Sequence, residues 1–376
     1  MSVTRRSFIR TLGVGGAGLL SVSEVAARGS EALAGGDGPT GALIRLDSNE
    51  NPAGPGAKAL EAMRAAFPES SRYPHRTGTS LPDAIAAFHG VPADHVLATC
   101  GSGEVLRMVV EAFASPARPL VTGLPTFETC TKTARFLRAG LHEVPVDGSL
   151  ALDMKAMAER AAGGAGIVFL CNPNNPTGTV HGEGRVADFV RGVMKASPGT
   201  VTLVDEAYHE FVEDPAYRSA IPLALEHPQV LVCRTFSKVH GLAGMRIGYV
   251  IGKPETLERL AGWRLGNGLN MLGIRAAIAA LGDREHVERS RAANRAGRER
   301  LRRFFQGRGF RVADSHTNFV LADVRRDAAA FQKACRDLGV AVGRPFPPLD
   351  TWTRVSVGTP EENERALAVF ARVLAG

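Results

Sequence analysis

The stretch Thr235-Phe236-Ser237-Lys238-Val239-His240-Gly241-Leu242-Ala243-Gly244-Met245-Arg246 places one lysine between hydroxyl residues and a glycine-rich run, directly after an apolar run at 230–233. Only seven of the 45 basic residues are lysines. Arginine keeps its proton, whereas a lysine whose pKa is lowered can act as an amine nucleophile. Lys238 is therefore a candidate for Schiff-base chemistry. The alternative is an ordinary surface lysine in a loop.

Outward from this stretch, short apolar runs alternate with helical patterns. The runs that we interpret as strands are 96–99, 120–122, 141–146, 167–171, 201–204, 230–233 and 247–251. Continuous apolar strands separated by helices indicate a mostly parallel sheet that is buried on both faces. The sequence therefore predicts an α/β fold with a seven-stranded sheet between helices.

The C-terminal third has a different pattern. Residues 257–305 read as helical, 310–324 as a hairpin-like pair, 331–338 as a helix and 354–357 as a strand, and Thr359 begins a capping box before a last helix. This pattern predicts a smaller α+β domain. We divide the chain into residues 1–34, an arm and first helix at 35–68, a large cofactor-binding domain at 69–256, and an interdomain helix with the small C-terminal domain at 257–376.

Polar and aromatic residues follow the predicted strand ends, where open α/β sheets bind their ligands. These residues are Ser102 and Gly103 after the first strand, Phe127 after the second, Asn175 after the fourth, Asp205 and Tyr208 after the fifth, and Thr235, Ser237 and Lys238 after the sixth. Ser102 and Gly103 also open a helical pattern, and a helix N-terminus of small residues favours a phosphate. The set points to one site at this edge of the sheet.

The chemistry of pyridoxal phosphate (PLP) matches this set. The cofactor needs a lysine for its Schiff base, a carboxylate that keeps the ring nitrogen protonated, donors to the phenolic oxygen, a phosphate cradle and an aromatic on the ring face. The candidates are, in that order, Lys238; Asp205; Asn175 with Tyr208; Ser102, Gly103, Thr235, Ser237 and Arg246; and Phe127. The sequence thus predicts a PLP site, and no cysteine pair has metal-ligand spacing.

Each candidate also has a purely structural explanation. Asp205 could cap a helix and Asn175 could stabilise a turn. Phe127 could belong to the core, and Arg246 could pair with a surface carboxylate. All of these explanations would have to hold together, in chain order and always at strand ends, so we favour the cofactor hypothesis.

At this point the sequence resembles the fold type I PLP-dependent aminotransferases, and among them the histidinol-phosphate aminotransferase family. The most specific segments are Cys-Asn-Pro-Asn-Asn-Pro-Thr-Gly at 171–178, Asp-Glu-Ala-Tyr at 205–208, and Ser-Lys followed by Gly-x-Arg at 237–246. Further matching segments are 49–52, 72–74, 125–127, 317–319 and 354–359. The resemblance covers the chain from about residue 44 to its end.

The resemblance implies roles for individual residues. Lys238 would carry the cofactor and move the proton at the substrate Cα, with Asp205 and Tyr208 as further catalytic residues. Arg354 would clamp the substrate carboxylate, and Asn49 would contact the substrate. Tyr73 would reach the cofactor phosphate of a neighbouring subunit, which implies a homodimer.

Arg344 is similar to a family arginine that lines the substrate side-chain pocket, although a solvent-facing loop arginine is an equal alternative. Departures from the family pattern occur in the segment Gly-Ser-Gly-Glu at 101–104, at Ala53, at His240 and at residues 264–270. We interpret these changes as lying near the substrate. They put histidinol phosphate in doubt as the substrate and leave the PLP chemistry untouched.

Composition and charge restrict the remaining classes of function. The chain has 376 residues, 44% of them hydrophobic, and a net charge of +7. Arginines and glutamates interleave over 284–311, which is typical of a solvated helix face and gives no sign of a nucleic-acid site. The five cysteines are interpreted as buried free thiols.

The first 34 residues have the pattern of a targeting segment. Arg5-Arg6 precedes an apolar run at 12–22 that is too short to span a membrane, and Ala32-Leu33-Ala34 is a small-x-small cleavage site. This segment resembles a twin-arginine (Tat) export signal and predicts a periplasmic or exported protein. The alternative is an amphipathic N-terminal helix of a cytoplasmic protein.

The expected function is the transfer of an amino group between an L-amino acid, or an amino-alcohol phosphate, and a 2-oxo acid. An alternative enzyme class is a PLP-dependent decarboxylase or lyase, because threonine-phosphate decarboxylases look similar in sequence. A third alternative is a protein that binds PLP without turnover. The complete set of candidate residues argues against this last hypothesis.

Overall fold

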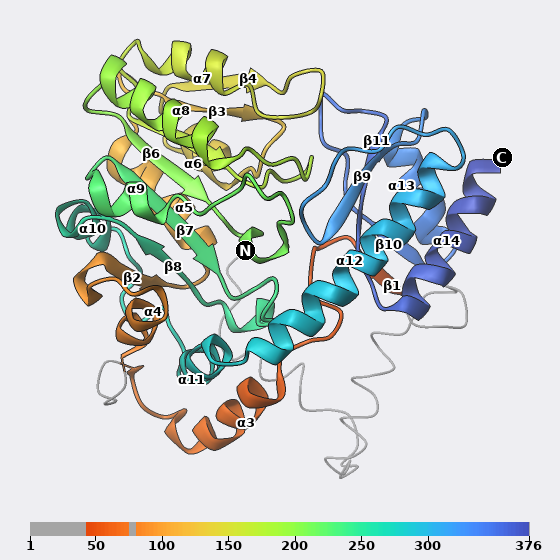
Figure 1. Cartoon of the computed structure of the whole chain (residues 1–376), viewed down its shortest axis with the longest axis horizontal. Coiled ribbons are helices and arrows are strands. Elements are labelled where there is room, and N and C mark those ends of the chain that lie inside the picture. Colours follow the sequence, from red (N-terminus) through yellow and green to blue (C-terminus); the bar gives the residue numbers. More distant parts are fainter. Residues whose placement is uncertain (1–42, 75–79, 376) are drawn as a thin grey trace, which may run out of the picture. The chain divides into compact units, whose positions relative to one another are not determined.

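The central sheet has seven strands, which confirms the fold expected from the sequence (Figure 1). The computed structural model describes residues 43–74 and 80–375. The strands are β2 (Val96–Thr99), β3 (Leu120–Leu124), β4 (Leu141–Pro145), β5 (Ile167–Cys171), β6 (Val201–Asp205), β7 (Val230–Thr235) and β8 (Gly248–Ile251), in the order β2-β8-β7-β6-β5-β3-β4. The pairings of β8 with β2 and with β7 are antiparallel, and the other four pairings are parallel, so the sheet is mostly parallel.

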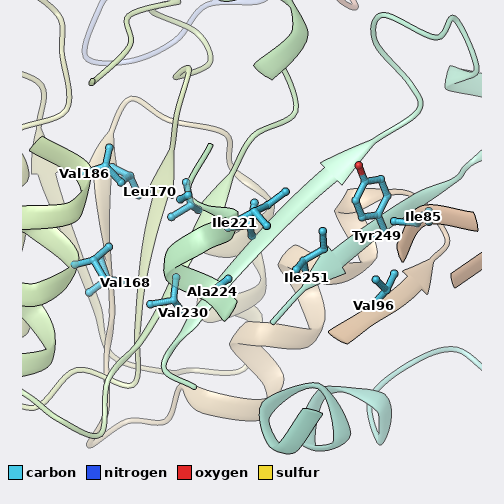
Figure 2. Packing of buried hydrophobic residues seen from close by; sticks show 14 of the residues in the cluster. Ile85, Val96, Val168, Leu170, Val186, Ile221, Ala224, Val230, Tyr249 and Ile251 are labelled. Carbon is cyan, nitrogen blue, oxygen red and sulfur yellow. The ribbon is translucent and has the colours of Figure 1, made fainter. Parts of the chain in front are cut away.

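Alternate residues of each central strand are buried on opposite faces of the sheet. On β5, Phe169 packs with α5 (Ser102–Phe113) and α6 (Thr129–Phe136). Val168 and Leu170 point the other way, toward α7 (Met154–Ala161), α8 (Glu183–Ala196) and α9 (Ile221–Glu226) (Figure 2). Burial on both faces explains the continuous apolar runs and fixes the strand ends against helices on both sides.

The remaining helices flank the sheet or follow it in the chain. They are α3 (Ala57–Ala66), α4 (Leu81–His89), α10 (Pro254–Ala261), α11 (Met271–Leu281), α12 (Arg284–Gln306), α13 (Ala328–Asp337) and α14 (Pro360–Ala375), with short 3-10 turns at Phe67–Glu69, Ala93–His95, His209–Phe211 and Ala243–Met245. The helical pattern expected for 257–305 is thus interrupted by the loop at 262–270. On α12, arginines pair with glutamates, as for Arg291 with Glu288.

Two small sheets and a separate core form the C-terminal region. β1 (Ile44–Leu46) pairs parallel with β10 (Val340–Val342), and β9 (Phe319–Asp323) pairs antiparallel with β11 (Trp352–Ser356). The hairpin-like pair expected at 310–324 is present in part: residues 311–313 pair antiparallel with β9 through the Val312–Ala322 bridge and two backbone hydrogen bonds. The full-length partner strand of β9 is β11.

The capping box predicted at Thr359 is present. The Thr359 hydroxyl accepts a hydrogen bond from the Glu362 backbone N–H at 3.1 Å, and the Glu362 carboxylate accepts one from the Thr359 N–H at 2.8 Å. The helix that follows, α14, supplies Phe370 to a core with Phe305 and Phe331. This reciprocal cap fixes where α14 begins, next to the site residues of β11.

The predicted export signal lies outside the described residues. The described residues belong to one unit that begins at Leu43, and the proposed division of that unit into a large and a small domain stays a prediction. Within residues 43–74 and 80–375, none of the helices has the length and apolar character needed to cross a membrane. All five cysteines are free thiols, and four of them are buried.

Candidate active site

A cavity of about 420 Å³ lies where β5, β6 and β7 end and α5 begins. Its lining contains all but two of the site residues expected from the sequence: Asn49, Ser102, Gly103, Phe127, Asn175, Asp205, Tyr208, Thr235, Ser237, Lys238, Arg246 and Arg354. These residues come from segments as far apart as Asn49 and Arg354. The parallel sheet and the N-terminal arm therefore bring the predicted set together.

Asp205 is the last residue of β6 and is only 2% exposed. In the strand register it lies between Cys171 of β5 and Cys233 of β7. Its carboxylate accepts a hydrogen bond from the Ala207 N–H at 3.1 Å and makes no ion pair within the described part of the chain. Burial raises the pKa of Asp205 to about 6. A bound group with a positively charged N–H would complete this environment.

The next residue, Glu206, is buried with a partner. Arg234 donates to one Glu206 oxygen from Nε at 3.0 Å and from Nη2 at 2.8 Å, and the backbone N–H of Ala220 donates to the other. Burial alone would raise the pKa of Glu206, but Arg234 and the hydrogen bonds bring it below its ordinary value. This ion pair joins the end of β6 to β7 and so holds Asp205 and the lysine segment in register.

Lys238 is partly buried and faces the cavity. Its Nζ donates a hydrogen bond to the Asn49 carbonyl oxygen at 3.1 Å and lies 5.6 Å from the centre of the Tyr208 ring. Burial, and after it the positive charge of Arg354, lower the pKa of Lys238 to about 8. Far more molecules therefore carry a neutral Lys238 amine near neutral pH than for an ordinary lysine, and the neutral amine is the form that acts as a nucleophile or proton acceptor.

The N-terminus of α5 has the features of an anion site. Ser102 and Gly103 begin the helix, and the Arg246 guanidinium donates to the Ser237 hydroxyl at 3.4 Å. Gly101 has φ +75°, and a Cβ there would lie 2.5 Å from Nη2 of Arg246. Only glycine lets the arginine approach the helix end this closely. Hydroxyls, helix N–H groups and a guanidinium thus converge on a position suited to a phosphate.

Arg354 on β11 supplies a second positive charge to the cavity. Its Nη1 donates to Asn175 Oδ1 at 2.6 Å and its Nη2 to the Asp47 carbonyl oxygen at 2.7 Å, while the buried Nε has no partner. Burial lowers the pKa of Arg354 to about 10. Within the described chain it forms no ion pair, so it is available to bind an anionic group of a ligand.

The structure places Arg344 and Tyr73 outside this lining. The Arg344 guanidinium pairs with Glu128 at 2.8 Å and lies 4.2 Å from the centre of the Phe346 ring. The Arg354 guanidinium lies 4.9 Å from the centre of the same ring, so Arg344 sits beside the cavity with Phe346 next to it. Tyr73 is 65% exposed and does not line the cavity of its own chain.

The interpretation of the family departures as changes near the substrate does not fit this geometry. Ser102 and Gly103 of the segment 101–104 line the cavity at the position expected for the cofactor phosphate, whereas Ala53, His240 and residues 264–270 do not line it. His240 is buried, with its ring 5.1 Å from that of Phe236. These departures therefore lie apart from the groups that would meet a substrate within this chain.

Sequence reasoning missed the residues that hold Asn49. Its backbone adopts φ +54°, a left-handed conformation that is unusual outside glycine. Ser356 donates its hydroxyl to Asn49 Oδ1 at 2.8 Å, Asn49 Nδ2 donates to the Tyr208 hydroxyl at 3.0 Å, and Asn318 Nδ2 donates to the Asn49 carbonyl at 2.9 Å. The signal for Asn318 was a polar residue directly before the apolar run of β9. Glu50 and Cys171 also line the cavity and were not predicted.

The residues present fit PLP. The unpaired carboxyl of Asp205 matches a protonated ring nitrogen, the α5 N-terminus with Arg246 matches the phosphate, and Lys238 lies in the same cavity. Phe127, Asn175 and Tyr208 line the remaining space. Each requirement named from the sequence therefore has a residue at the cavity wall.

Comparisons with known proteins agree with this geometry. Residues 42–370 match the family model described as aminotransferase class I and II. The chain is 42% identical over 334 residues to the histidinol-phosphate aminotransferase of Symbiobacterium thermophilum, covering 88% of this chain and 91% of that protein.

Solved structures of similar fold also include proteins named histidinol-phosphate aminotransferase. A putative histidinol-phosphate aminotransferase from Erwinia carotovora atroseptica matches with a TM-score of 0.83 at 33% identity, covering 88% of this chain and 95% of that one. A histidinol-phosphate aminotransferase from Sinorhizobium meliloti, solved in complex with pyridoxal-5'-phosphate, matches with a TM-score of 0.81 at 25% identity, covering 100% and 99%.

The lowered pKa predicts how Lys238 reacts. In cofactor-free protein, modification of Lys238 by an uncharged amine reagent should rise with pH, because only the neutral amine reacts. The rate should reach half its plateau near pH 8, whereas an ordinary lysine needs about pH 10.4. Peptide mass spectrometry across this pH range measures the midpoint.

Two arginine variants provide the control. Arg354→Met should move the midpoint upward, because Arg354 disfavours the protonated form. Arg344→Met should leave the midpoint in place, since Arg344 is paired with Glu128 outside the cavity. A midpoint near the ordinary lysine value in the parent protein would contradict the electrostatic account of the site.

Proposed function

The chain belongs to the class I and II aminotransferases, and from this premise we propose that its cavity moves the amino group of an L-amino acid, or of an amino-alcohol phosphate, to a 2-oxo acid. The enzyme is a PLP-dependent transaminase. The assignment of roles rests on one observation. Lys238 shares one cavity with Asp205 and Arg354, and neither of these two forms an ion pair within the described residues.

The proposed cofactor contacts follow from the cavity wall. Asp205 would face the ring nitrogen, Asn175 and Tyr208 the phenolic oxygen, and Phe127 the ring. The phosphate would lie at the α5 N-terminus, held by Ser102, Gly103, Thr235, Ser237 and Arg246. When bound, PLP supplies an electron sink that stabilises the negative charge left at the substrate Cα.

Lys238 is proposed to move the proton at the substrate Cα. Burial and the charge of Arg354 lower its pKa to about 8, so its Nζ is a neutral amine near neutral pH far more often than that of an ordinary lysine. The Asn49 carbonyl, 3.1 Å away, fixes the direction of the amine by accepting one of its hydrogens. A base whose pKa lies close to the operating pH can both take and return a proton.

Arg354 is proposed to orient the substrate through an anionic group. Its guanidinium is held by Asn175 and by the Asp47 carbonyl, so a carboxylate or phosphate that binds it meets a fixed geometry. Asn49, fixed by Ser356 and Asn318, would offer a second contact from the cavity wall. Orientation of the Cα–H bond relative to Lys238 follows from these two contacts.

Histidinol phosphate is one specific candidate for the amino donor. It is supported by the 42% identity to a protein named histidinol-phosphate aminotransferase. It is also supported by the position of Arg344, because the guanidinium groups of Arg344 and Arg354 both lie against the ring of Phe346. Arg344 could bind an anionic group if its ion pair with Glu128 broke. A carboxylate-bearing L-amino acid needs Arg354 alone.

The function is tested by the visible absorption of the PLP-loaded protein. An amino donor should bleach the cofactor band, and a 2-oxo acid should restore it. Histidinol phosphate and a panel of L-amino acids tested separately identify the donor. Bleaching without restoration, or release of carbon dioxide, would favour the decarboxylase or lyase alternative.

The matched variants are Lys238→Ala and Lys155→Ala, the second at an exposed lysine. Lys238→Ala should lower turnover by at least about a thousandfold, because it removes the group that moves the proton. Lys155→Ala should keep full turnover. Turnover in Lys238→Ala within a few-fold of the parent would remove this lysine from the mechanism.

We also propose that the mature enzyme is an exported homodimer. The Tat-like N-terminus supports export. Exposed Phe67, Tyr73, Trp263 and Leu265 support a partner surface, and Tyr73 would then reach the cofactor phosphate of the partner subunit. Native mass spectrometry of protein from the periplasm should give twice the mass of a chain that begins after Ala34. A monomer would contradict the dimer, and a full-length cytoplasmic chain would contradict export.

A further inference from the structure

Arg344 lies beside Arg354 because the backbone of its neighbour approaches Arg354 closely. The N–H of Gly343 donates to the Arg354 carbonyl at 2.8 Å. A Cβ at Gly343 would lie 2.8 Å from that oxygen and 3.1 Å from the Arg354 Cβ, so a larger residue would push the two segments apart. The Arg344 and Arg354 guanidinium groups also lie 4.2 and 4.9 Å from the centre of the Phe346 ring. The chain thus places a second arginine next to the one that would bind the substrate carboxylate.

Glu128 forms an ion pair with this second arginine. Its Oε2 lies 2.8 Å from Nη2 of Arg344 and 2.8 Å from Nζ of Lys132. The backbone of Glu128 is fixed at the start of α6, where its carbonyl accepts from the Thr131 hydroxyl at 2.9 Å and from the Lys132 N–H at 2.8 Å. Phe127, directly before it in the chain, lines the candidate active site. A carboxylate is therefore held at the edge of the site, against the arginine beside Arg354.

The pair is close enough to the active site to matter and exposed enough to open. After burial, the charges that shift the pKa of Arg354 include Arg344, which lowers it, and Glu128, which raises it. The side chains of Arg344 and Glu128 are 46% and 35% exposed, so a ligand can reach both. An ion pair this exposed contributes little to stability and can break. A ligand anion that binds Arg344 must nevertheless displace Glu128 and then lies near an unpaired carboxylate.

The rest of the cavity offers no other partner to a second anion on the substrate. The described lining contains two further cations, Lys238 and Arg246, and the proposed function uses both for the cofactor. Phe127 lines the cavity and is 39% exposed, so it offers apolar surface to a side chain. A distal anion would therefore depend on Arg344, whereas an apolar side chain would not.

We propose that Glu128 is a specificity-determining residue: by keeping Arg344 paired, it makes the enzyme select amino donors with an uncharged, apolar side chain over donors that carry a second anionic group. The inference rests on the proposed function, in which Arg354 binds the carboxylate of the donor. The disfavoured donor has to displace a carboxylate, while the favoured donor leaves the ion pair intact. Such a penalty on the wrong ligand is a general source of specificity.

Two acids of equal chain length isolate this preference, and neither has an amino group that could react with the cofactor. Pentanoate offers one carboxylate to Arg354, and glutarate adds a second carboxylate at its other end. Titration calorimetry on the PLP-loaded full chain measures both affinities. Glu128→Gln should tighten glutarate binding about fivefold, the contribution of one surface ion pair. It should leave the affinity for pentanoate unchanged.

Glu143→Gln is the matched control, because Glu143 is a partly buried carboxylate whose ion pair is with Arg135. This variant should leave both affinities unchanged. In the double variant Glu128→Gln/Arg344→Met, the gain for glutarate should be lost. Unchanged or weaker glutarate binding in Glu128→Gln would overturn the proposal, and so would a gain that persists in the double variant.

Arg354→Met separates the failure of this inference from the failure of the proposed function. It should weaken the binding of both acids at least about tenfold, because it removes the charge that both carboxylates share. Pentanoate that fails to bind the parent, or that binds Arg354→Met equally well, would overturn the proposed role of Arg354 and this inference with it. An unchanged glutarate affinity in Glu128→Gln, with pentanoate binding still dependent on Arg354, would overturn this inference alone.

Discussion

The burial of the Asp205 carboxyl at the end of β6, without an ion pair, is the constraint on which the site depends. Removing a charged group from water costs several kcal/mol even in a real protein. Packing must therefore hold the residue in place, and here it lies between β5 and β7 in a sheet covered on both faces. The paired neighbour Glu206 clamps the same strand end to Arg234. The fold thus presents one carboxyl with an ion-pair partner and one without in adjacent positions.

A second constraint joins the arm to the C-terminal strands. Asn49 adopts a left-handed backbone and is held through Ser356 and Asn318, while its carbonyl accepts from Lys238. Strained backbone of this kind persists only where surrounding contacts determine it. The cavity is therefore complete only when β9 and β11 are in place beside the sheet, and the lysine, the substrate-side arginine and the arm form one hydrogen-bonded unit.

The sheet and most of the site could be predicted from the sequence because both follow local rules. Continuous apolar runs identify buried parallel strands. Ligands of such sheets bind where the strands end, and this rule identified Lys238, Asp205 and Asn175. Pairing between distant segments does not follow local rules. The segment before β9 pairs with it over only a few residues, and its full-length partner is β11, which lies about 30 residues further along the chain.

Long-range side-chain contacts could not be predicted from the sequence either. The hydrogen bond from Arg354 to Asn175, the ion pair of Arg344 with Glu128 and the role of Asn318 depend on where elements meet in space. The family departures at Ala53 and His240 looked like substrate contacts in the sequence, yet they face other surroundings. The export signal predicted at residues 1–34 lies outside the described residues.

The substitution Asp205→Asn tests the central claim most directly. Asparagine has the same shape and can still accept the Ala207 N–H, so PLP binding and the unfolding midpoint should be retained. It cannot hold a positively charged ring nitrogen, so the account predicts a fall in kcat of at least about a hundredfold, similar to losing one charge-stabilising group in other enzymes. A kcat within a few-fold of the parent in the folded, PLP-loaded variant would contradict the role of the buried carboxyl.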